Sequence, residues 1–190
     1  MQLNLRLFHV LITIVLCVAA SVIVISVMTM KQKLPLAASP ALPADVAGLT
    51  YQVEGSRALD EIGDAAALRA LPERLRHPSG GDVLYGVFIS ATNSGDATQQ
   101  LARRFELVDA NFRIFTRLPL AAGSAYGYRP GRLPPGGRAP ANWSPVAENL
   151  VEEGYPLVFR LRGAAYRQRL TLRIFDPAGS ASPGEIIVQS

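Results

Sequence analysis

The sequence predicts an all-β fold, an antiparallel β-sandwich with one short helical connection, preceded by a single transmembrane helix. Three observations support this. Residues 7–30 contain no Asp, Glu, Lys or Arg. From Leu49 onward, short runs alternate apolar and polar side chains and end at turn residues, which is typical of strands with one buried face. Apart from one short segment, that part of the sequence shows no helical period.

The apolar segment Leu7–Met30 has 24 residues. A helix of that length reaches roughly 36 Å, enough for a hydrocarbon core of about 30 Å. A cleaved signal peptide usually has an apolar core of only about 7–15 residues. Cleavage after Val18-Ala19-Ala20 would also leave an apolar N-terminus. We therefore expect an uncleaved signal-anchor with its flanks over residues 1–33.

The charges beside this segment do not decide its orientation. Arg6 and the α-amine precede it, and Lys31 and Lys33 follow it, which is nearly an even balance. A short N-terminal tail followed by an external domain is the usual simple arrangement. We expect a single-pass protein of the cell membrane with its C-terminal domain outside the cytoplasm.

Residues 34–48 are rich in Pro and Ala and almost free of charge. This composition is typical of an extended linker. The predicted organisation is an anchor over 1–33, a linker over 34–48 and a β-sandwich domain over 49–190.

Seven segments of the domain carry strand patterns. Asp109-Ala110-Asn111 is a plausible hairpin connection between the third and the fourth segment. The seven predicted strands are Leu49–Val53, Val83–Thr92, Phe105–Val108, Phe112–Thr116, Pro156–Leu161, Arg167–Phe175 and Glu185–Gln189.

Residues Asp60–Arg76 break this pattern and predict a short helix. Asp64 is a candidate N-cap for Ala65–Leu71, and Pro72 would interrupt the helix. We expect the segment to connect two strands across one end of the sandwich.

Four runs in this order resemble the bacterial telokin-like extracellular domain family: Val87–Ala97, Phe105–Phe115, Pro156–Leu161 and Leu170–Asp176. The resemblance implies an immunoglobulin-like sandwich attached to the envelope by a helix or a lipid. It implies no catalytic site, because the shared motifs describe the fold. The long loop Leu118–Val146 and the helical connection depart from the family pattern.

Composition excludes several kinds of site. The single cysteine, Cys17, lies in the apolar segment, and residues 34–190 contain no Met and one His, His77. Such a domain cannot assemble an internal disulfide, a zinc finger, a copper site or an iron–sulfur cluster. Residues 34–190 carry 16 basic and 15 acidic residues, so a nucleic-acid binder is not expected. We expect no cofactor, no metal and no enzymatic activity.

Carboxylates leave an alternative open. Asp60, Glu61 and Asp64 form one acidic group, and a second group is Glu148, Glu152 and Glu153. They are either solvated loops, a shared cation site, or the acid–base groups of a carboxylate-dependent envelope hydrolase. Neither group has the spacing of a dedicated calcium loop.

Four arginines on neighbouring predicted strands are candidate contact residues: Arg160, Arg162, Arg169 and Arg173. If those strands pair across the Gly163–Tyr166 turn, the guanidinium groups share one outward face. Such a face suits an anionic ligand or an acidic protein, or it merely keeps the strands soluble.

The loop Leu118–Val146 holds six Pro and five Gly, with Tyr126, Tyr128 and Trp143. Loops of this length are usually functional or disordered. The aromatic side chains either contact a partner or pin the loop to the sandwich. The sequence thus predicts a membrane-tethered, extracytoplasmic interaction module, with these aromatic and arginine residues as its candidate contacts. Its expected partner is another envelope or membrane protein, as in an accessory component of an envelope assembly.

Overall fold

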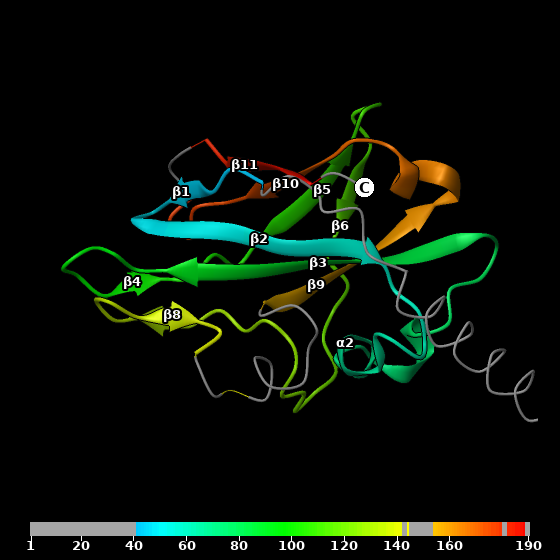
Figure 1. Cartoon of the computed structure of the whole chain (residues 1–190), viewed down its shortest axis with the longest axis horizontal. Coiled ribbons are helices and arrows are strands. Elements are labelled where there is room, and N and C mark those ends of the chain that lie inside the picture. Colours follow the sequence, from blue (N-terminus) through cyan, green and yellow to red (C-terminus); the bar gives the residue numbers. More distant parts are fainter. Residues whose placement is uncertain (1–40, 142–143, 145–153, 180–181, 189–190) are drawn as a thin grey trace, which may run out of the picture. The chain divides into compact units, whose positions relative to one another are not determined.

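The computed structural model describes residues 41–141, 144, 154–179 and 182–188 (Figure 1). The chain divides into two compact units, residues 1–37 and 38–190, and all described residues belong to the second. The predicted anchor over residues 1–33 lies outside the described residues. No helix within the described ranges is long and apolar enough to cross a membrane.

Two antiparallel sheets make up most of the described domain. In sheet 1, β3 is central, with β2 on one side and both β9 and β8 on the other. Its strands are β1 (Ala44–Val46), β2 (Leu49–Ala58), β3 (Asp82–Thr92), β8 (Arg138–Ala139) and β9 (Tyr155–Arg162).

Sheet 2 has the strand order β11-β10-β5-β6. A separate small ribbon pairs β4 (Gln99–Gln100) with β7 (Arg132–Leu133). The strands of sheet 2 are β5 (Phe105–Asp109), β6 (Ile114–Thr116), β10 (Leu170–Ile174) and β11 (Gly184–Val188).

The two sheets share one hydrophobic core, because alternate residues of each strand point inward. On β10, Leu170, Leu172 and Ile174 are buried and the residues between them are only half-buried. They pack with inward residues of sheet 1 such as Val87 and Phe159. The predicted alternation and the all-β, antiparallel class are confirmed.

The predicted helical connection is also present. Helix α2 (Ala65–Arg69) follows Asp64 as predicted, and the 3₁₀ turn η1 (Glu73–Leu75) follows Pro72. Asp64 makes no capping hydrogen bond through its side chain. A second cluster joins Leu68 and Leu71 to Leu84 and Val158, so α2 covers the outer face of sheet 1. On β3, this cluster covers the outward-facing Leu84.

The linker prediction is wrong at its C-terminal end. Residues 44–46 of the predicted linker form β1, which pairs with the start of β2. Ala47 and Gly48 connect the two strands with φ of 51° and 76°, as a two-residue hairpin turn requires. The domain therefore starts before Leu49.

The predicted pairing of the two arginine-bearing strands is wrong as well. β9 pairs with β3, whereas β10 pairs with β5 and β11. Between them, Gly163–Arg167 forms the 3₁₀ helix η2, which carries the chain from one sheet to the other instead of closing a hairpin.

Candidate functional site on the outer face of sheet 2

Tyr128 of the predicted aromatic surface is a core residue. Its ring packs edge-on against Phe105 and Tyr155, with centroids 5.0 and 5.6 Å away. Its hydroxyl donates a hydrogen bond of 2.8 Å to the Ala102 carbonyl, and burial raises its pKa well above the ordinary tyrosine value. Tyr128 pins the loop to the sheets, so its prediction as a contact residue is wrong.

The other two aromatic residues give no support to a contact surface. Tyr126 is half-buried, and its backbone N–H donates to the Ser124 hydroxyl at 3.3 Å. Trp143 lies outside the described residues.

The four predicted arginines do not form one face, because they belong to two different sheets. Arg160 and Arg162 lie on β9; Arg162 is exposed, and the buried Nε of Arg160 has no hydrogen-bond partner among the described residues. Arg173 on β10 and Arg169 just before it belong to sheet 2. Only these last two come together at a candidate site.

Arg169 and Arg173 line a shallow depression of about 340 Å³ on the outer face of sheet 2. β5, β10, β11 and the β5–β6 hairpin contribute to it. Its uncharged lining is Val108, Ala110, Phe112 and Thr171, and its charged lining is Asp109, Arg169, Arg173 and Glu185.

A cross-strand row of mainly apolar side chains runs through the same face. The register places Thr171 opposite Ile187 on one side and Val108 on the other, and Val108 opposite Ile114. Ile187 and Ile114, at the two ends of the row, are 47% and 55% exposed. Large apolar side chains thus reach solvent on both edge strands of sheet 2.

Phe112 lies at the tip of the β5–β6 hairpin. The Phe112 N–H donates to the Asp109 carbonyl at 3.0 Å, and the Asp109 N–H donates to the Arg113 carbonyl at 3.1 Å. These bonds close a three-residue loop whose third position takes a left-handed conformation, usually occupied by glycine. Phe112 occupies it with φ of 61° and is 83% exposed. A side chain in this conformation costs about 1 kcal/mol.

The Asp109 carboxylate holds the hairpin tip in shape. It accepts hydrogen bonds from the N–H groups of Asn111 and Arg113, both at 2.9 Å, and from Arg113 Nε at 2.6 Å. Burial acts to raise the pKa of Asp109, but the hydrogen bonds from Arg113 and Asn111 and the charge of Arg113 outweigh it and lower the pKa. The tip is therefore a preorganised structure that displays an aromatic ring.

A second depression, also of about 340 Å³, lies near α2 and includes His77, Glu61 and Asp82 in its lining. His77 is exposed, and its Nδ1 lies 3.0 Å from Glu61 Oε1. The one histidine of residues 34–190 therefore contacts a carboxylate.

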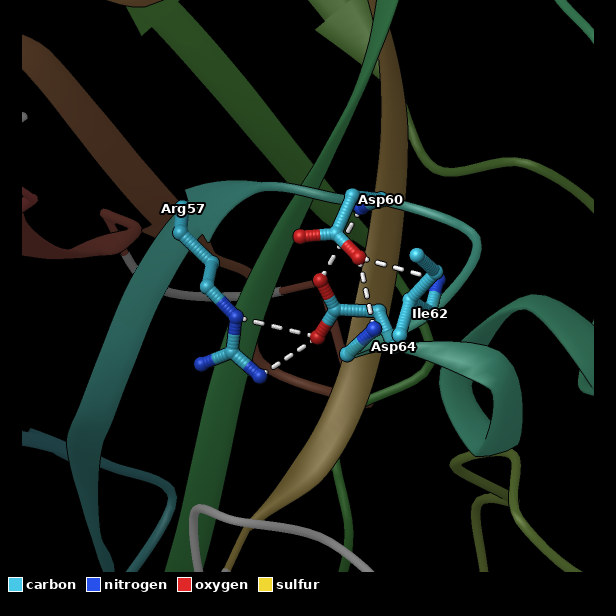
Figure 2. Close-up of polar contacts among 5 residues, drawn as sticks. Arg57, Asp60, Ile62 and Asp64 are labelled. Atoms are coloured by element: carbon cyan, nitrogen blue, oxygen red, sulfur yellow. Dashed lines mark hydrogen bonds and ion pairs between the residues drawn. The ribbon is translucent and has the colours of Figure 1, made fainter. Parts of the chain in front are cut away.

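Asp60 and Asp64 of the first acidic group hold their own loop (Figure 2). The Asp64 carboxylate accepts from Arg57 Nε at 2.9 Å and from the Asp60 N–H at 3.0 Å. The Asp60 carboxylate accepts from the N–H groups of Ile62 and Gly63. Across the described ranges, no three or more His, Cys, Asp or Glu side chains converge as metal ligands would. The second group, Glu148, Glu152 and Glu153, lies outside them.

No protein-family model and no curated protein matches the chain. Among solved structures, the chain is similar to the yjhA protein from Bacillus subtilis, with 10% sequence identity and a TM-score of 0.40 over 70% of this chain and 76% of that chain. A conserved hypothetical protein from Bacillus anthracis gives 11% identity and a TM-score of 0.43 over 77% and 97% of the two chains. The putative ApaA protein from Bordetella pertussis gives 18% sequence identity and a TM-score of 0.33 over 78% of this chain and 92% of that chain. At these TM-scores the similarities carry no argument about function.

Proposed function

We propose that this chain is a membrane-tethered, extracytoplasmic protein-binding module whose contact surface is the outer face of sheet 2 and the hairpin tip at Phe112. The conformation of Phe112 carries the proposal. Its ring is 83% exposed, so folding gains little from it, while φ of 61° is unfavourable for its side chain. Contact with a partner accounts for both properties, since exposed aromatic rings on rigid tips bind at a low entropic cost.

The Phe112 tip lies at one end of sheet 2. Asp109, where the hairpin begins, pairs with Leu170, and Leu170 pairs with Val188. At the other end of β11, Gly184 packs so closely against Val46 of β1 that a Cβ at position 184 would meet it. Since the described residues enter the domain at β1, the Phe112 tip lies at the end of sheet 2 away from that entry point.

The fold we propose is an immunoglobulin-like sandwich of the telokin-like kind. Two residues of the resembling runs support it, because each organises a turn. The Asn93 side chain donates to the carbonyls of Ala97 and Leu133, both at 2.9 Å. The Asp109 carboxylate holds the β5–β6 hairpin by accepting hydrogen bonds from the backbone N–H groups of Asn111 and Arg113.

The anchor and the localisation rest on the apolar segment Leu7–Met30. Protease added to spheroplasts is expected to digest the protein beyond about residue 40 and to spare the anchor. Full protection of the domain would contradict an extracytoplasmic location.

We propose further that the domain acts by binding and not by catalysis. The carboxylates Asp60, Asp64 and Asp109 are already held by backbone N–H groups or arginines, which leaves them poorly suited to proton transfer. A carboxylate-dependent hydrolase built on Glu148, Glu152 and Glu153 is the competing function. Alanine at all three positions should leave partner capture unchanged.

A photo-crosslinking amino acid tests the contact surface in the cells that produce the protein. Benzoylphenylalanine at position 112 keeps an aromatic side chain and should give a discrete protein adduct on irradiation. The matched control is the same amino acid at position 62, because Ile62 is 96% exposed on the other loop that an aspartate braces. Equal adducts from both positions, or none from position 112, would reject this surface.

A further inference from the structure

The charges of the depression on sheet 2 are paired with one exception. Asp109 pairs with Arg113 at 2.6 Å, and Arg173 Nε lies 2.8 Å from Glu185 Oε1. Glu106, opposite Arg173 on β5, pairs with Arg104 at 2.6 Å. Arg169 is the one charged residue of the lining that has no ion pair within the described part of the protein.

Arg169 stands at the same end of the sheet as Phe112. It directly precedes Leu170, which pairs with Asp109, the first residue of the hairpin turn. Arg169 is exposed, so its guanidinium can be reached from solvent. The depression therefore offers one uncompensated cation beside an exposed aromatic ring and the apolar residues Val108 and Ala110.

We infer that the partner is a protein segment that presents a carboxylate to Arg169 and an adjacent apolar side chain to Phe112. This inference rests on the proposed function and names the chemistry of its partner. A guanidinium binds a carboxylate through two parallel hydrogen bonds, which fixes orientation as well as charge. The apolar neighbours exclude water from one side of that pair. The depression, at about 340 Å³, has room for a few side chains and lies at the small end of ligand sites.

An anionic lipid headgroup could also meet an arginine, and the experiment separates the two sources. The full-length protein, in its native membranes, carries benzoylphenylalanine at position 112, combined with Arg169→Gln, Arg169→Lys or Arg162→Gln. Arg162 is the matched control because it is an exposed arginine on sheet 1, so both glutamine variants remove the same charge.

Arg169→Gln should reduce the yield of the protein adduct by about two- to fivefold, the upper part of the range expected for an exposed charge pair. Arg169→Lys should retain part of the yield, and Arg162→Gln should retain all of it. Mass spectrometry should place the crosslink within a few residues of an Asp, a Glu or the C-terminal carboxylate of the partner protein.

Equal yields from Arg169→Gln and Arg162→Gln would overturn the carboxylate inference and leave the contact surface standing. A crosslink far from any carboxylate would do the same. An adduct whose added mass is that of a lipid would replace the protein segment by a headgroup. The absence of any adduct at position 112 in the parent protein would reject the proposed function itself.

Discussion

The β5–β6 hairpin and the Asp60–Asp64 loop are built alike and differ in one respect. Each displays a large apolar residue, Phe112 and Ile62, that is 83% and 96% exposed. Each is braced by a buried aspartate whose carboxylate accepts hydrogen bonds from the backbone and from an arginine: Asp109 with Arg113, and Asp64 with Arg57. Only Phe112 requires a left-handed backbone.

That difference distinguishes a residue that is merely exposed from a candidate contact residue. Ile62 occupies a position that many residues could fill, and single exposed apolar side chains are ordinary on protein surfaces. Phe112 occupies a position where glycine or asparagine would be more stable. It also borders a depression with an unmatched positive charge, whereas the depression near α2 contains the paired His77 and Glu61. The residue that lowers stability is the better candidate for a contact.

The largest expected effect on stability comes from removing the aspartate that braces each loop. Asp64→Ala and Asp109→Ala should each lower the free energy of unfolding by about 2–4 kcal/mol, because each removes a buried carboxylate that accepts from partly buried backbone and arginine donors. Urea unfolding of the detergent-solubilised full-length protein, followed by circular dichroism, measures this. Asp96→Ala, in an exposed loop, is the control and should change stability by less than about 0.5 kcal/mol. A small loss at Asp109 would mean that its carboxylate does not brace the tip.

A smaller effect concerns pH at the hairpin. The pKa of Asp109 is lowered from its ordinary value of 3.8, so its stabilising contribution is complete above that value and is lost as the pH falls through the lower folded-state pKa. Asp109→Asn should therefore be less stable than the parent protein by about 1–2 kcal/mol at pH 6. The difference should shrink below pH 3.8. Thermal unfolding of both proteins between pH 2.5 and 6, about the range over which a carboxylate titrates, measures it.

Arg113→Gln provides the matched control for this pH dependence. It removes the charge and the side-chain donor that lower the pKa of Asp109, while the backbone N–H groups of Asn111 and Arg113 stay in place. Its stability should depend on pH less steeply than that of the parent protein. An identical pH profile in all three proteins would contradict the described role of Asp109.

Much of the fold was predictable from sequence, since alternation shows which side chains of a strand are buried. Leu170, Leu172 and Ile174 illustrate this. Alternation does not identify the partner of a strand, however. It could not show that β9 pairs with β3 while η2 leads to β10 in the other sheet. The prediction that four arginines share one face was wrong for that reason, although two of them, Arg169 and Arg173, do line the depression.

The rest of the candidate site depends on backbone conformation. Phe112 carries a strand-forming side chain and directly follows a turn sequence, so the pattern predicts a strand starting there; the structure starts β6 at Ile114. The available sequence signal was a hairpin loop of three residues after Asp109. The third residue of such a loop takes a left-handed φ, and here that residue is Phe112. Tyr128 lies in a loop without regular alternation, so its burial could not be read from a period.

The smallest expected change in stability concerns the ring of Phe112 itself. Phe112→Asn keeps a residue that tolerates the left-handed region and removes the ring. It should raise the free energy of unfolding by about 0.5–1 kcal/mol, measured by the same urea titration, and abolish co-purification of the protein captured at this position. Ile62→Asn, which relieves no such strain, should leave both stability and capture nearly unchanged. Lower stability in Phe112→Asn would mean that the ring supports the fold, and Phe112 would then be a structural residue like Tyr128. Higher stability together with lost capture is expected only of a residue whose ring serves a partner.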